Sequence, residues 1–152
     1  MDEAAPAESS GSGGDLLSAS DLLSIHRLLA WYGHVLDERR WDDLDELFTA
    51  DAVFDASAFP GRRPLASLEQ IRAMVVSAEA GHPLAHHATN VVITATSPDT
   101  ACVKSKGVHP REDGTWISTV YLDEVSRTPR GWRFDRRVIT PCPTSDTAPQ
   151  PG

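Results

Sequence analysis

Apolar residues recur with helical spacing near the start of the chain. Between residues 19 and 38 they stand three and four positions apart, at Leu22, Ile25, Leu29, Tyr32 and Leu36. This period predicts an amphipathic helix. Ser18 and Asp21 form a capping-box pattern just upstream, which is typical of a helix N-terminus.

Two further helices and one strand are expected before residue 84. The spacing of Leu44, Leu47 and Phe48 predicts a short helix from Trp41, and residues 52–54 (AVF) then indicate a strand. A third helix is predicted from Ser67, ending near Gly81 and Pro83.

The second half of the chain changes to β-rich runs separated by compact turns. Four antiparallel strands are predicted at 86–96, 100–109, 115–126 and 131–140. Helices first and a meander last indicate an α+β fold, in which three N-terminal helices pack on a curled antiparallel sheet. Such a sheet leaves a cavity at its open end, where small molecules usually bind.

Composition assigns the chain of 152 residues, 40% of them hydrophobic, to a single domain. Residues 1–15 and 141–152 are dominated by Ala, Pro, Ser, Gly, Asp and Thr, a composition that predicts disordered tails around a folded domain at 16–140.

The net charge of −8 disfavours nucleic acid and anionic membranes as partners. Neither an N-terminal signal sequence, with a basic segment and an apolar run, nor an apolar stretch long enough to span a membrane is evident in the sequence. A cytoplasmic protein is therefore expected. Cys102 and Cys142 lack the paired spacing of a metal or redox site. We expect neither a metal nor an organic cofactor.

Three sets of segments carry a family resemblance. They are residues 31–37 (WYGHVLD) with 41–44 (WDDL) and 47–52 (LFTADA), residues 86–93 (HHATNVVI), and residues 131–134 (GWRF) with Arg136 and Arg137 behind them. Together they resemble the SnoaL-like proteins of the nuclear transport factor 2-like (NTF2-like) superfamily. The resemblance implies a cone-shaped fold with a pocket, on which enzymes and pure binding proteins both occur.

Within that superfamily, the branch containing scytalone dehydratase and bile-acid 7α-dehydratase uses an Asp–His pair. The resemblance places this pair at Asp37 and His86, with Tyr32 as a third catalytic residue. It also implies three substrate contacts, at His109, Arg137 and Asn90. A tyrosine of scytalone dehydratase is replaced here by Ala56, which argues against the specific scytalone reaction.

A neutral histidine can remove a proton beside an electron-withdrawing group when a carboxylate holds its other ring nitrogen. Asp37 and His86 supply such a pair. Ala30, Gly33 and Asp37 share one stripe of the first helix. This stripe either leaves room beside Asp37 or simply permits a close helix–sheet contact, with Asp37 as an exposed carboxylate.

Strand alternation restricts the remaining candidates. His86 and His87 point to opposite faces, so only one can meet Asp37, and the family spacing favours His86. His109 ends a face of small residues, as in a pocket wall, although a position at the rim fits equally. Strict alternation turns Arg137 away from the aromatic face unless a bulge intervenes.

The leading hypothesis is a cofactor-independent dehydratase, isomerase or cyclase that acts on a small hydrophobic, cyclic metabolite. The alternative is a non-catalytic protein that binds a small molecule or a partner. A small subunit of an oxygenase is a third, less favoured class. A homodimer formed through the outer sheet face is expected.

Overall fold

The long helix α1 (Ala19–Asp37) begins at the predicted capping box. In the computed structural model, which describes residues 16–78 and 82–143, the Asp21 N–H donates to the Ser18 hydroxyl over 3.1 Å. The Ser18 N–H donates back to the Asp21 carboxylate over 3.0 Å. The apolar face of α1 is buried at Ile25, Leu28, Leu29, Tyr32, Val35 and Leu36. Caps and apolar burial together fix this helix.

The second helical segment, η1 (Trp41–Glu46), is a short 3₁₀ helix. Strand β1 (Phe48–Asp55) starts directly after it, so Phe48, expected on the helix, lies on the strand. Phe48 pairs with Phe134 of the last strand. Pairing within the sheet therefore overrides the local helical spacing.

Helix α2 (Leu68–Ser77) begins where the sequence predicts. The Ser67 hydroxyl accepts a hydrogen bond from the Gln70 N–H over 3.2 Å, which is an N-cap interaction. Ile71 and Val75 face the core. Gly81, expected to help end this helix, lies outside the described residues.

Five strands form one sheet in the order β1-β5-β4-β3-β2. The four later strands are antiparallel as predicted: β2 (His87–Ser97), β3 (Thr100–Pro110), β4 (Trp116–Thr128) and β5 (Gly131–Pro141). The early strand β1 joins β5 in parallel, so the sheet is mixed and the predicted antiparallel arrangement covers its four later strands. Local alternation reveals a strand but not its partner, which here lies far along the chain.

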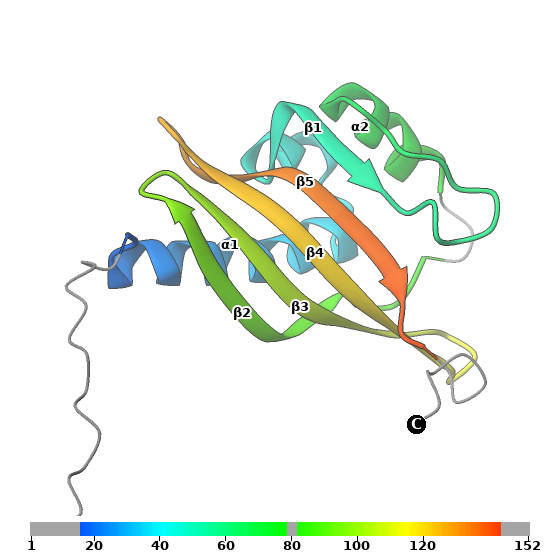
Figure 1. The fold of residues 1–152 in the computed structure, drawn as a ribbon. Helices are drawn as coiled ribbons and strands as arrows, with labels where there is room; N and C mark the ends of the chain where they lie inside the picture. Colours follow the sequence, from blue (N-terminus) through cyan, green and yellow to red (C-terminus); the bar gives the residue numbers. More distant parts are fainter. Residues whose placement is uncertain (1–15, 79–81, 144–152) are drawn as a thin grey trace, which may run out of the picture.

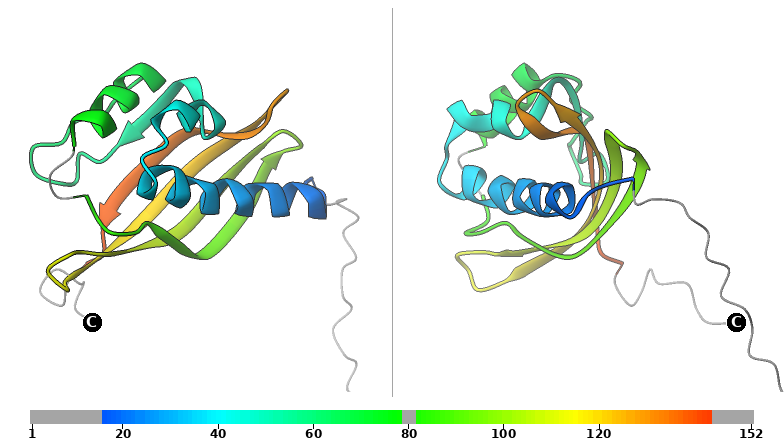
Figure 2. Two further views of the ribbon diagram at one scale, coloured as in Figure 1. Left: turned by 180° about the vertical axis from the view of Figure 1, so that it is seen from behind. Right: turned by 90° about the vertical axis from the view of Figure 1, so that its left-hand side faces the viewer.

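The sheet curls around α1, which crosses its concave face (Figures 1 and 2), while α2 packs beside β1 at one end. The core between the layers is apolar, with Leu44, Leu47, Val103, Val125 and Phe134 almost wholly buried. None of the helices within residues 16–78 and 82–143 is long and apolar enough to cross a membrane.

Candidate functional site

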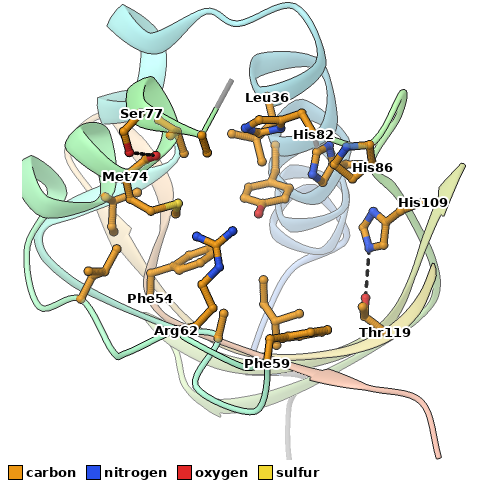
Figure 3. Close-up of a pocket in the computed structure, with 18 of the residues that line it drawn as sticks. Leu36, Phe54, Phe59, Arg62, Met74, Ser77, His82, His86, His109 and Thr119 are labelled. Carbon is orange, nitrogen blue, oxygen red and sulfur yellow. Dashed lines mark hydrogen bonds between the residues drawn. The ribbon is translucent and has the colours of Figure 1, made fainter. Parts of the chain in front are cut away.

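A cavity of about 700 Å³ lies between α1, α2, the loop 56–65 and one end of the sheet (Figure 3). Most of its wall is apolar and includes Leu36, Phe54, Phe59, Ile71, Met74, Ile117 and Ile139. Its polar groups include Tyr32, His82, His86, His109, Thr119 and Tyr121. An apolar cavity of this size with a few polar groups suits a small organic molecule.

Asp37, the last residue of α1, contacts His86, which stands just before β2. The Asp37 Oδ1 atom lies 2.7 Å from His86 Nδ1, and Oδ2 accepts the backbone N–H of His86 over 3.1 Å. The two side chains are 25% and 11% exposed. One carboxylate thus holds both the backbone and the ring of His86, and a ring that donates from Nδ1 keeps a lone pair on Nε2.

Gly33 brings these two segments together. A Cβ atom built on Gly33 would lie 2.4 Å from the carbonyl oxygen of His86, so only glycine lets the segment before β2 approach the helix this closely. Ala30, on the same stripe, is exposed. The stripe therefore serves a close helix–sheet contact, and Asp37 at its end is paired with His86 instead of standing alone.

Burial lowers the pKa of His86 below its ordinary value, and the hydrogen bond and charge of Asp37 offset part of that effect. The imidazole is therefore neutral near pH 7, the state required of a general base. His87, the next residue, is exposed. This is the outcome that the alternation of strand residues allows: one histidine lines the cavity and the other faces solvent.

Tyr32 stands on the same face of α1 and is 3% exposed. Its ring centre lies 6.1 Å from that of His86, with the two rings perpendicular. Burial raises the pKa of the Tyr32 hydroxyl, and the charge of Arg137 partly opposes this. The hydroxyl therefore keeps its proton and can donate a hydrogen bond.

Arg137 is turned inward by a bulge. The pairing of β4 with β5 changes register between Glu124 and Val125, which face Arg136 and Phe134. The extra residue brings Arg137 to the same buried face as Phe134. Its guanidinium forms two hydrogen bonds of 2.8 and 2.7 Å with the Asp123 carboxylate.

The guanidinium carbon of Arg137 also lies 4.0 Å from the centre of the Tyr32 ring. Arg137 is not among the residues that line the cavity. Arg137 thus lies behind the cavity lining, where it packs against Tyr32 and pairs with Asp123. Its predicted contact with substrate stays a prediction.

His109 lines the cavity, which is one of the two positions that its place on the strand left open. Its Nε2 atom lies 3.1 Å from both the Thr119 hydroxyl and the Tyr121 hydroxyl, and its ring centre is 5.1 Å from that of His86. Gly107 leaves the room for this cluster, because a Cβ there would lie 2.2 Å from the Thr119 hydroxyl. Burial, followed by the nearby His86, lowers the pKa of His109 to about 4.

Asn90 lies outside the cavity. It is exposed and has a φ of 54°, at the point where the pairing of β2 with β3 shifts between Thr89 and Val92. Asparagine tolerates this left-handed conformation better than most residues. Its observed position is therefore in a bulge of the strand, outside the cavity lining, and the substrate contact stays a prediction.

Sequence reasoning did not select His82 as a candidate site residue. It lines the cavity, and its ring centre lies 6.1 Å from that of His86 and 6.1 Å from that of Trp41. Arg62, Arg63 and Arg111 line the same cavity. They stand on irregular segments, where no periodic pattern indicates the direction of a side chain.

Ala56, which takes the place of a tyrosine in scytalone dehydratase, also lines the cavity. The neighbouring residue on β1, Asp55, accepts hydrogen bonds from the Ser57 N–H and hydroxyl. Within residues 16–78 and 82–143, no three His, Cys, Asp or Glu side chains are grouped to hold a metal ion.

Comparison with known proteins connects this geometry to a family. The model of the SnoaL-like domain family matches residues 18–138. An uncharacterized protein of Mycobacterium tuberculosis is 33% identical over 132 residues, covering 81% of this chain and 86% of the relative.

Two solved structures from Novosphingobium aromaticivorans have a similar fold. The first, named as a candidate aromatic ring hydroxylase, is 30% identical with a TM-score of 0.69 and covers 84% of this chain and 92% of its own. The second, an NTF2-like protein with a cystatin-like fold, is 23% identical with a TM-score of 0.71 and covers 84% and 86%. The expected α+β fold of the NTF2-like kind is confirmed.

Proposed function

The chain belongs to the SnoaL-like domain family, and we propose that it is a cofactor-independent acid–base enzyme, a dehydratase, isomerase or cyclase, acting on a small hydrophobic cyclic molecule. The observation that carries the proposal is the 2.7 Å contact of Asp37 with His86 at the wall of a largely apolar cavity. The 30% identity to a candidate aromatic ring hydroxylase favours a ring-containing ligand.

The proposed reaction begins with proton transfer from a carbon next to a carbonyl group to Nε2 of His86. The electrons of the C–H bond pass to the carbonyl oxygen, and Asp37 stabilises the imidazolium that forms. The Tyr32 hydroxyl, which keeps its proton, can donate to the developing oxyanion. The enolate electrons then re-form the carbonyl group. If they form a C=C bond and break the C–O bond to a hydroxyl on the next carbon, that hydroxyl takes the proton from His86 and leaves as water, which is dehydration. If another carbon of the conjugated system takes the proton, the result is isomerisation.

Deuterium exchange tests the first step, removal of the proton by His86, and does not require the final product to be known. A panel of cyclic ketones is incubated with the protein in D₂O, and deuterium uptake beside the carbonyl is measured by mass spectrometry. We expect the wild-type chain to accelerate uptake for at least one member. His86→Ala and Asp37→Asn should each reduce that acceleration by about 10²–10⁴-fold, the usual contribution of a positioned base.

His87→Ala is the matched control, because His87 is the adjacent and exposed histidine. It should keep the wild-type rate, and circular dichroism should show that all variants are folded. If a ligand binds but no deuterium exchange depends on His86, the proposed acid–base activity is contradicted. The alternative of a non-catalytic binding protein is then favoured.

A further inference from the structure

The loop between β1 and α2 carries an arginine over the cavity. Its two ends are joined by a pair of backbone hydrogen bonds between Phe54 and Leu65, each 2.9 Å long. Within the loop, the Phe59 N–H donates to the carbonyl oxygen of Ala56 over 2.9 Å, and the Arg62 N–H donates to the carbonyl oxygen of Phe59 over 3.2 Å. These bonds give the loop a defined course, which sets the position of Arg62.

The guanidinium of Arg62 points into the cavity (Figure 3), which Phe54 and Met74 also line. Its charge reaches one cavity histidine, since Arg62 contributes to lowering the pKa of His82, after burial, His86 and Arg39. Arg62 is thus directed at the space a ligand would occupy.

The charge around this cavity opposes that of the whole molecule. The chain has 22 acidic and 14 basic residues, yet among the described residues that line the cavity there are three arginines and no aspartate or glutamate. Within residues 16–78 and 82–143, Arg62, Arg63 and Arg111 form no ion pair. A mostly apolar cavity whose acidic and basic lining residues are all arginines attracts an anionic ligand, even in an acidic protein.

We propose that the molecule bound in this cavity is a small aromatic or alicyclic acid, whose carboxylate pairs with Arg62 while its ring packs on the apolar wall. A guanidinium binds a carboxylate through two parallel hydrogen bonds, which gives both orientation and affinity. The inference rests on the proposed function in so far as it names the substrate class of the His86 site. Its test measures binding alone, so failure of the proposed chemistry would not affect it.

Two fluorescent probes of nearly the same shape separate charge from apolar contact. One is 8-anilinonaphthalene-1-sulfonate, whose sulfonate stands in for the carboxylate, and the other is the uncharged N-phenyl-1-naphthylamine. Both are titrated into the full chain. Arg62→Gln should weaken binding of the sulfonate about tenfold or more, as expected for loss of a charge-assisted pair. The dissociation constant of the neutral probe should change by less than about twofold.

Arg136→Gln is the matched control, because Arg136 is exposed on β5 and does not line the cavity; it should bind both probes like the wild type. Ala56→Trp fills part of the cavity wall and should weaken both probes. An equal effect of Arg62→Gln on the two probes, or no effect on either, overturns the proposal. So does unchanged binding of both probes to Ala56→Trp, because the cavity would then not be their site.

Discussion

At the scale of single residues, the pKa of His86 sets the pH range in which the proposed base can act. Burial lowers this pKa from its ordinary value of 6.5, so the neutral base persists at pH values where an exposed histidine is already protonated. We expect the rate of deuterium exchange to be level above pH 6.5 and to fall only at lower pH. The measurement is the exchange rate as a function of pH.

The same residue gives an independent check by NMR titration of the His86 ring. Asp37 raises the pKa of His86 against the effect of burial, so Asp37→Asn should lower it further. A His86 ring that protonates above its ordinary value, or a higher pKa in Asp37→Asn, would contradict this account of the site.

Individual residues differ in how far the sequence could predict them. Asp37 and His86 stand in segments with family-like spacing, and strand alternation separated His86 from its neighbour. Arg62 and His82 could not be placed, because they stand on irregular segments whose course depends on tertiary contacts. The pairing of Asp37 with His86 was predictable, whereas the positions of Arg62 and His82 in the cavity were not.

At the scale of elements, the contact between α1 and the start of β2 depends on Gly33. Gly→Ala in a helix usually stabilises a protein by about 0.5–1 kcal/mol. Here the added Cβ would lie 2.4 Å from a backbone oxygen of His86. We expect Gly33→Ala to destabilise the fold by about 1–3 kcal/mol, as overpacking does, and to reduce exchange by separating Asp37 from His86. Urea unfolding and the exchange assay measure the two effects.

Ala30→Ser, one turn earlier on the same stripe and exposed, is the control and should change neither quantity appreciably. A stabilised Gly33→Ala variant would show that the close approach of α1 to His86 is not needed. Increased stability is the ordinary result of this substitution in a helix, so the sign of the change decides the question.

Element types were largely predictable from periodicity, since α1, α2 and the four later strands lie close to their expected positions. The exceptions arise from pairing between strands. Phe48 joins a strand because it pairs with Phe134, and Arg137 faces inward because β5 bulges. Neither pairing register nor a bulge is visible in local alternation.

At the scale of the whole molecule, the sheet is joined around a buried ion pair. Asp123 of β4 and Arg137 of β5 are direct cross-strand partners, and Arg137 also pairs with Phe54 of β1. Both charged side chains are 0% exposed.

The homodimer expected through the outer face of the sheet stays a prediction. Two apolar side chains on strands β2 and β4, Val92 and Leu122, are exposed.

Loss of one partner of this pair should weaken the whole fold. Asp123→Asn leaves the Arg137 charge buried without its carboxylate, which typically costs about 3–5 kcal/mol. Chemical denaturation should show this loss as a lower free energy of unfolding. The double variant Asp123→Leu with Arg137→Met removes both charges and should recover most of the loss, because apolar side chains of similar size can replace a buried pair. If Asp123→Asn unfolds like the wild type, the pair does not hold the sheet together; if the double variant is no more stable than Asp123→Asn, a role beyond charge compensation is required.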